Sequence, residues 1–236
     1  MIIVGMLLAG VRYATGRKMK MQFELLDRQR ALELERTRIA RDIHDDLGAN
    51  LTQIALLSEL AQTDLEDPTL ARSHLKGIFT TAGAVARQLD EIVWAITPAN
   101  DTLEQFTSYV CKYAQDNLRV AGIRCRLDVP EPVPDYYMTS AQRHDFFLAA
   151  KEALHNVVKH AHADQVWLRL KVEDGALVLT IEDNGKGIDK RSVTAATGHG
   201  LANMRNRLKH VGGIFDQKSE IGLGTSVRLM LPLSRR

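Results

Sequence analysis

Apolar residues recur every three or four positions along two stretches of the first hundred residues. This spacing is typical of a helix that packs along another helix. In the first stretch the recurring positions are Ile43, Leu47, Asn50, Ile54, Leu57 and Ala61. In the second they are Leu75, Ile78, Ala82, Val85, Leu89, Ile92 and Ile96. The sequence therefore predicts a two-helix hairpin that turns at Asp67-Pro68, and pairing of two hairpins into a four-helix bundle would bury its apolar surface.

After Pro98 and a linker at residues 99–101, the pattern changes to a mixture of helices and strands. Helical periodicity covers Leu103 to Ala121, about Ser140 to His160, and Leu201 to Lys209. Alternation of apolar and polar residues predicts strands at 123–129, 166–173, 176–182, 214–218 and 225–231. We therefore expect one mixed sheet covered on one face by helices, an α/β sandwich that follows the helical hairpin.

The first eleven residues are apolar and are followed by Arg12, Arg17, Lys18 and Lys20. A spanning helix needs roughly twenty apolar residues, and a signal peptide carries its basic residues before the apolar run. Basic residues after the run are typical of the cytoplasmic side of a membrane helix. Residues 1–11 are therefore interpreted as the remnant of a transmembrane helix, with an apolar leader of no membrane role as the alternative.

The composition is that of an ordinary globular protein, with 45% hydrophobic and 25% charged residues among 236. A net charge of +2 is too small to suggest a nucleic-acid partner, and we expect no direct contact with nucleic acid. Cys111 and Cys125 are too few for a disulfide framework and lack metal-ligand spacing.

His44 lies one residue past Ile43, at the edge of the first apolar row. Ala40 and Gly48, one turn before and after it, leave room for a bulky group to approach the ring. Asp45 supplies a carboxylate that can orient the ring or accept its proton. His44 is therefore a candidate for chemistry, although a histidine in such a place is more often an ordinary surface residue.

Two segments of the second half are candidates for binding a metal and phosphate groups. Glu152 and Asn156 are four residues apart and share a helical face, with Lys159 and His160 close below. A carboxylate, an amide oxygen and a lysine suit a magnesium-phosphate group, although a plain polar face has the same pattern. The segment 197–201 opens a helix with two glycines and offers backbone N–H groups to phosphates.

Asp183 ends an apolar strand and is followed by Asn184-Gly185-Lys186-Gly187. A buried aspartate can accept from an exocyclic amine, and glycines let the backbone approach a ligand. Alone, this segment could equally be a tight turn.

The order of these segments is more specific than any one of them. The acid-amide helix, the segment 183–187, the glycines at 198 and 200, and Gly222-Leu223-Gly224-Thr225 resemble the nucleotide-binding boxes of the GHKL ATPase superfamily. With residues 41–48 upstream, the chain resembles a two-component sensor histidine kinase, more narrowly the nitrate-sensor-like subfamily in which an aspartate directly follows the phospho-accepting histidine. The resemblance covers about Leu32 to Leu233.

The resemblance implies three parts: the apolar residues 1–11, a helical stalk and dimerisation hairpin over 12–100, and an ATP-binding catalytic domain over 101–236. It implies that His44 is the phospho-acceptor and that Asp45 activates it. Asn156 matches the magnesium ligand, with Glu152 beside it, and Asp183 matches the residue that reads the adenine amino group. The remaining implied ATP-binding positions are Lys159, His160, Gly185, Gly187, Gly198, Gly200 and Thr225. Of these, Gly198 and Gly200 match the flexible lid over the phosphates; the lid runs over 189–199, and Gly200 directly follows it.

The implied activity is autophosphorylation on His44 with ATP and Mg²⁺, then transfer of the phosphoryl group to an aspartate of a separate response regulator. The implied assembly is a homodimer whose catalytic region lies in the cytoplasm, tethered to the inner face of a bacterial plasma membrane. A GHKL-type ATPase acting as a clamp, or a serine kinase of the anti-sigma type, is the alternative. Neither would need a hairpin that carries His44 and Asp45.

Overall fold

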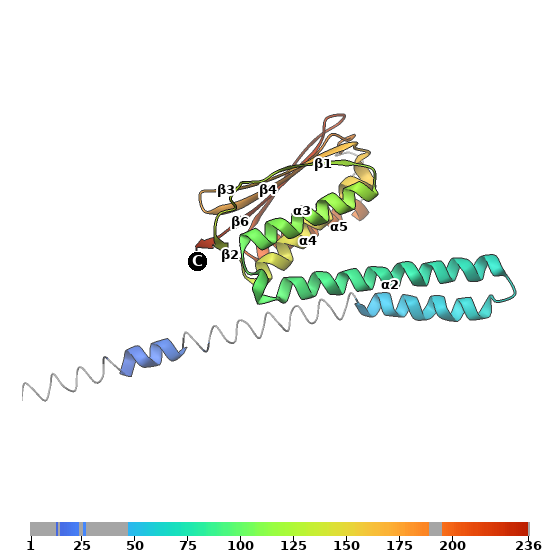
Figure 1. Ribbon diagram of the computed structural model, residues 1–236, viewed down its shortest axis with the longest axis horizontal. Helices are drawn as coiled ribbons and strands as arrows, with labels where there is room; N and C mark the ends of the chain where they lie inside the picture. Colours follow the sequence, from blue (N-terminus) through green and yellow to red (C-terminus); the bar gives the residue numbers. More distant parts are fainter. Residues whose placement is uncertain (1–12, 14, 24–25, 27–46, 189–194, 236) are drawn as a thin grey trace, which may run out of the picture. The chain divides into compact units, whose positions relative to one another are not determined.

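The computed structural model describes residues 13, 15–23, 26, 47–188 and 195–235 (Figure 1). It divides into two compact units, Met1–Leu89 and Asp90–Arg236. The division falls within helix α2 (Pro68–Ile96), whereas the sequence placed a domain boundary after residue 100. None of the helices in the described ranges is long and apolar enough to cross a membrane.

The first unit contains a helical hairpin. Residues 47–63 are helical, and α2 begins at Pro68 after a short turn. Asp67 starts α2, because its carboxylate accepts from the backbone N–H groups of Thr69 and Leu70 at 2.9 and 3.2 Å. The predicted hairpin is therefore present, and near its turn the two helices are joined by a hydrogen bond between His74 Nε2 and Asp64 Oδ2 at 3.0 Å.

The two helices of the hairpin pack along the rows that the sequence indicated, with one difference. In the first helix, the predicted positions from Leu47 to Ala61 are its less exposed residues. In α2, Ile78 and Val85 are half-buried, but Leu75 and Leu89 are 59% and 42% exposed. The apolar pattern of α2 therefore contains two rows, one within the hairpin and one on its surface. We call the second the exposed row; its members are Leu75, Phe79, Ala82, Ala86 and Leu89.

The second unit contains a five-stranded sheet with helices on one face (Figure 1). Strand order is β1-β3-β4-β6-β5; β1 pairs parallel to β3 and the other pairs are antiparallel, so the predicted mixed sheet is confirmed. The strands of this sheet are β1 (Arg124–Asp128), β3 (Gln165–Glu173), β4 (Ala176–Asp183), β5 (Ile214–Glu220) and β6 (Gly224–Pro232). The helices are α3 (Leu103–Val120), α4 (Ser140–Asn156), the π-helical turn η2 (Val157–Ala161) and α5 (Ala195–His210).

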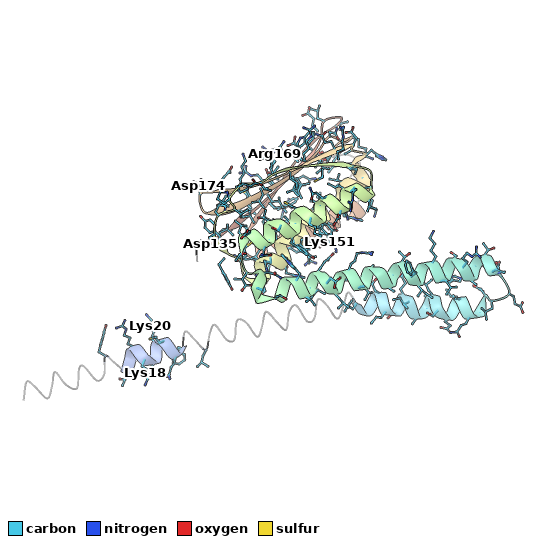
Figure 2. All side chains as sticks on the ribbon, in the orientation of Figure 1. Lys18, Lys20, Asp135, Lys151, Arg169 and Asp174 are labelled. Atoms are coloured by element: carbon cyan, nitrogen blue, oxygen red, sulfur yellow. The ribbon has the colours of Figure 1, made fainter. Side chains whose placement is uncertain are left out.

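Local sequence signals explain where these elements begin and end. Thr139 and Gln142 form a capping box at the start of α4. Gly122 follows α3 with a φ of 74°, a conformation that favours glycine. Asp174 and Gly175 both have positive φ, as a two-residue hairpin between β3 and β4 requires. Figure 2 labels Asp174 at this turn.

The core of the second unit lies between the sheet and its helices. Its fully buried side chains include Leu103, Phe106, Phe146, Leu154, Leu168, Leu179 and Leu229. The other face of the sheet carries polar residues such as Arg169, labelled in Figure 2, whose guanidinium pairs with Glu182. This alternation is expected of a sheet covered on one side.

Three features of the second unit differ from the sequence prediction. A small sheet pairs β2 (Tyr136–Tyr137) with β7 (Ser234–Arg235). The helix expected from Leu201 begins already at Ala195. A short 3₁₀ helix, η1 (Pro98–Asn100), occupies most of the expected linker.

Candidate functional site

A cavity of about 810 Å³ lies in the second unit between the helices and the sheet. It is lined from α4, η2 and α5 on one side and from β4, β5 and β6 on the other. Its lining residues are Glu152, Ala153, His155, Asn156, Val157, Lys159, His160, Ala161, Ile181, Asp183, Lys186, Gly187, Ile188, Gly200, Leu201, Met204, Gln217, Ile221, Thr225 and Val227.

Strand pairing builds the floor of the cavity from two neighbouring rows. Asp183 pairs with Thr225, and Thr225 pairs with Ser219; these three residues are the polar row. A second row lies beside the first, two residues away on each strand. In it Ile181 pairs with Val227, and Val227 pairs with Gln217. We call these the inner row. Side chains two residues apart on a strand face the same side, so both rows face the helices.

The polar row is held together by hydrogen bonds. The hydroxyl oxygens of Ser219 and Thr225 lie 2.9 Å apart, and the Ser219 hydroxyl donates to the Gly224 carbonyl and accepts from the Ile188 N–H at 2.8 Å. Asp183 is only 4% exposed, and its Oδ1 accepts from the Gly185 N–H at 2.9 Å. The row therefore presents a carboxylate and a hydroxyl in fixed positions.

Burial raises the pKa of Asp183, and the N–H groups of Gly185 and Thr225 oppose that rise by bonding the carboxylate. A buried carboxylate of this kind gains most from a ligand that offers it N–H donors. Asp183 is therefore suited to bind an amino group that enters the cavity.

The backbone after Asp183 passes so close to neighbouring chain that side chains are excluded. A Cβ on Gly185 would lie 2.2 Å from the Ala161 carbonyl oxygen, and Gly187 has a φ of +71°. The Lys186 N–H donates to the Ala161 carbonyl at 2.8 Å, and the Lys186 carbonyl accepts from the Gly222 N–H at 2.8 Å. The loop is thereby fixed between the end of η2 and the turn between β5 and β6.

Glu152 and Asn156 lie one turn apart on α4 and face the beginning of α5. A Cβ on Gly200 would lie 2.3 Å from Glu152 Oε1 and 3.8 Å from Asn156 Nδ2, so only glycine allows this approach. Among the described residues no group of three or more His, Cys, Asp and Glu side chains could hold a metal. A carboxylate and an amide nonetheless fit a magnesium ion that takes most of its ligands from phosphate and water.

Four basic side chains surround the helical side of the cavity: His155, Lys159, His160 and Lys186. Partial burial lowers the pKa of His160, and the charges of Lys159, His155 and Lys186 lower it further, while Glu152 opposes them. Among these groups only Glu152 carries a negative charge, so a bound anion would interact favourably with the basic side chains.

The structure brings together most of the residues that the sequence singled out. Eight line the cavity: Glu152, Asn156, Lys159, His160, Asp183, Gly187, Gly200 and Thr225. Gly185 lies in the loop beside it, and Gly198 lies in the first turn of α5. His44 and Asp45 lie outside the described residues, as do residues 189–194 of the predicted lid.

Sequence reasoning missed several cavity residues, among them Gln217 and Met204. Gln217 shares a strand face with Ser219, but a single glutamine in a strand carries no motif. Met204 lies one turn after Gly200 on α5, and its spacing is the ordinary spacing of a core residue. Only the fold shows that these two side chains reach the site.

Two family models match the chain. Residues 141–235 match the model described as histidine kinase-, DNA gyrase B-, and HSP90-like ATPase, and residues 35–101 match a model described as histidine kinase. The first range contains every residue that lines the cavity. The second contains His44 and Asp45.

Individual relatives agree with these models. The sensor histidine kinase DesK of Bacillus subtilis is 30% identical over 84% of this chain and 51% of its own length, and LiaS of the same organism is 27% identical over 84% and 54%. The chain thus spans about half the length of the curated relatives that it matches. The histidine kinase domain of the Erythrobacter litoralis EL346 blue-light activated kinase has the same fold, with a TM-score of 0.52, 19% identity, and coverage of 79% of this chain and 94% of that one.

Proposed function

Because this chain belongs to the sensor histidine kinases, we propose that it phosphorylates its own His44 with Mg-ATP and then passes the phosphoryl group to an aspartate of a response regulator. One observation carries the proposal: a buried aspartate, an acid-amide pair and a cluster of basic side chains line a single cavity. Each suits a different part of a magnesium nucleotide. Residues 35–101, which match the histidine kinase model, contain His44, and we assign to it the role of phospho-acceptor.

The base of the nucleotide is bound at the sheet. We assign to Asp183 the recognition of the exocyclic amine of adenine, because its buried carboxylate favours N–H donors. Thr225 presents a hydroxyl beside it in the polar row. Ile181, Val227 and Met204 supply apolar surfaces that suit the faces of the ring.

The phosphates are bound at the helical side. Lys159 provides positive charge there, and His160 provides a ring that can take up a proton beside the phosphates. The first turn of α5, which contains Gly198, offers backbone N–H groups and the positive end of a helix dipole, and Gly200 follows two residues later. Asn156, with Glu152 beside it, would hold Mg²⁺ through an amide oxygen and a carboxylate. When bound, the ion would neutralise charge on the phosphates and help to align them.

The chemical step is a displacement at the γ-phosphorus. A neutral ring nitrogen of His44 forms a bond to that phosphorus while its bond to the bridging oxygen breaks, and ADP leaves with the electron pair. Asp45 holds the proton on the other ring nitrogen and stabilises the imidazolium that forms. In the second step a carboxylate of the regulator takes the phosphoryl group as the N–P bond breaks.

We also propose that the chain acts as a homodimer paired through its hairpins. The exposed row of α2 supports this, because Phe79 is 82% exposed and no described residue covers it. The response regulator is a separate chain in this proposal. Residues 1–11 would tether the cytoplasmic catalytic region to the inner face of a bacterial plasma membrane, as their apolar composition and basic flank indicate.

Incubation with γ-labelled ATP and magnesium tests the proposal. The wild type should acquire label that is lost in acid and kept in base, as a phosphohistidine requires, whereas a serine kinase would give acid-stable label. His44→Gln should acquire none but still bind ADP. Replacement of another hairpin histidine, His74→Gln, is the matched control and should label normally. Label on His44→Gln would refute the assignment of the acceptor.

A further inference from the structure

Gln217 is a polar residue in an otherwise apolar part of the cavity floor. It pairs with Val227 in β6, which pairs in turn with Ile181 in β4, so the three form the inner row. All three line the cavity. Leucine or valine would complete this row at least as well as glutamine, so packing of the sheet does not explain the amide.

The hydrogen-bonding groups of the Gln217 side chain find no partner among the described residues. Ser219, on the same face of β5, satisfies its hydroxyl with the Ile188 N–H and the Gly224 carbonyl. Gln217 is half-buried and makes no such bond. The amide is not fully withdrawn from water, so a ligand that covers it has to replace that water with hydrogen bonds of its own.

We infer that Gln217 is a further polar contact to the nucleoside, at the opposite end from Asp183 and Thr225; this deepens the proposed function and rests on it. Asp183 and Gln217 lie two strands and one row apart, which places their Cα atoms about 12 Å from each other for ordinary strand spacings. A base lying over Ile181 and Val227 fits between the two side chains.

The chemistry of the two contacts is complementary. Asp183 only accepts, so it selects the exocyclic amine, whereas a primary amide both donates and accepts and can bond a ring nitrogen or a ribose hydroxyl. Anchors at two ends fix the orientation of the nucleoside, which one anchor cannot do. Gln217 is thus a positioning residue for the nucleotide and takes no part in the transfer itself.

Titration of the full chain with ADP and with adenosine, both without metal, tests this inference in Gln217→Leu. Loss of one neutral hydrogen bond should weaken both ligands by the same factor, about threefold to tenfold. The unliganded variant should unfold at the same or a higher temperature than the wild type, because leucine completes an apolar row. Lys218→Met, on the opposite face of β5, is the matched control and should bind both ligands like the wild type.

Affinities within twofold of the wild type in Gln217→Leu would overturn the role of Gln217 while leaving the kinase proposal in place. An equal loss in Lys218→Met would also overturn it, since the effect would then come from β5 as a whole. A wild-type chain that binds neither ADP nor adenosine would instead refute the proposed function.

Discussion

The ammonium nitrogen of Lys151, a residue labelled in Figure 2, lies 2.6 Å from a carboxylate oxygen of Glu91. This ion pair joins the middle of α4 to the last turns of α2. The next residue along α4, Glu152, lines the cavity instead. Nearby, Trp94 stacks on Tyr109 with ring centroids 3.8 Å apart and planes at 8°. The end of α2 is therefore an integral part of the nucleotide-binding unit.

Arg143 of α4 also connects the end of α2 to the rest of the second unit. Its side chain is fully buried and donates to the carbonyls of Ala95 at 2.6 Å and Met138 at 2.7 Å, and it pairs with Asp101. The sequence predicted a linker at residues 99–101, after Pro98, and a linker is where the domain that follows would be expected to pivot. Since the second unit packs on both sides of that proline, a pivot there would first have to break the contacts of Arg143.

Replacement of Arg143 by Met should strongly destabilise the second unit. The change leaves Asp101 and two buried carbonyls without their donor, for which about 3 kcal/mol is the expected loss in free energy of unfolding. Denaturant unfolding followed by tryptophan fluorescence measures it, because Trp94 and Trp167 both lie in this unit. Arg124→Met, which breaks an exposed ion pair with Asp164, should change stability far less, because both side chains of that pair are in water. Equal effects would show that burial of the arginine does not matter.

Gly200→Ala should impair phosphoryl transfer without unfolding the protein. The new methyl group would lie 2.3 Å from Glu152 Oε1, the end of a flexible side chain, so the carboxylate has to leave its place beside Asn156. We expect autophosphorylation to fall at least tenfold while adenosine binding changes little, because in the proposed binding mode the base contacts Asp183, at the other side of the cavity from Gly200. Gly83→Ala is the control, since its nearest neighbour, Arg87, is at an ordinary contact distance of 3.5 Å. Normal labelling of Gly200→Ala would contradict this account.

Much of the fold follows from local signals in the sequence. The strands of the main sheet alternate apolar and polar residues, and the two-residue turn at Asp174 has the composition that a tight hairpin requires. The small sheet of β2 and β7 was not predicted, because two-residue strands have no periodicity. The start of α5 was predicted at Leu201, because glycines at 198 and 200 are unusual within a helix. The helix in fact begins at Ala195, and the close approach of Glu152 requires a glycine at position 200 within it.

The candidate site was predicted where its residues belong to contiguous motifs and missed where the fold alone assembles it. Asp183, Gly187 and Thr225 come from motifs whose order is informative, and all three line the cavity. Gln217 reaches the same cavity only because β5 pairs with β6 in one particular register. For α2, the apolar spacing predicted a single row, because two rows on one helix share the same spacings of three and four residues.

Nucleotide binding should raise the pKa of His160. In the unliganded protein that pKa is lowered by burial and by the charges of Lys159, His155 and Lys186, so the ring is neutral at pH 7. Phosphate oxygens favour the charged ring, so nucleotide binding should be accompanied by uptake of a proton. The affinity for ADP should therefore rise as pH falls, until the pH is below the pKa of His160 in the unliganded protein. Titration of the ring signals by NMR with and without ADP measures the shift, with His160→Asn to assign the signal.

The control for the His160 measurement is His162→Asn. His162 has a φ of 54° at the end of η2, a conformation that asparagine also tolerates, and it does not line the cavity. Its replacement should leave the ADP-dependent shift unchanged. An unchanged or lowered midpoint for His160 in the presence of ADP would show that this ring does not face the phosphates.

The exposed row of α2 should drive dimerisation, and a charge placed in it should separate the subunits. Phe79→Lys adds an ammonium group where the single chain is 82% exposed, so the hairpin itself should lose little stability. In a dimer the same group would be withdrawn from water without a partner, at a cost of about 3 kcal/mol, or a hundredfold in the dimer dissociation constant. Thr80→Lys adds the same charge at the next position, which lies with Lys76 and Arg87 on an exposed polar row, and should leave the dimer intact.

Val85→Lys should behave differently from Phe79→Lys, because Val85 is half-buried and lies one turn from Gln88, whose amide oxygen accepts from Asn50 in the other helix of the hairpin at 3.4 Å. A charge there should lower the helix content as well as separate the subunits. Sedimentation velocity at micromolar concentration, together with circular dichroism, distinguishes the two results. A dimeric Phe79→Lys, or a wild type that sediments as a monomer, would show that subunits do not pair through this face of α2.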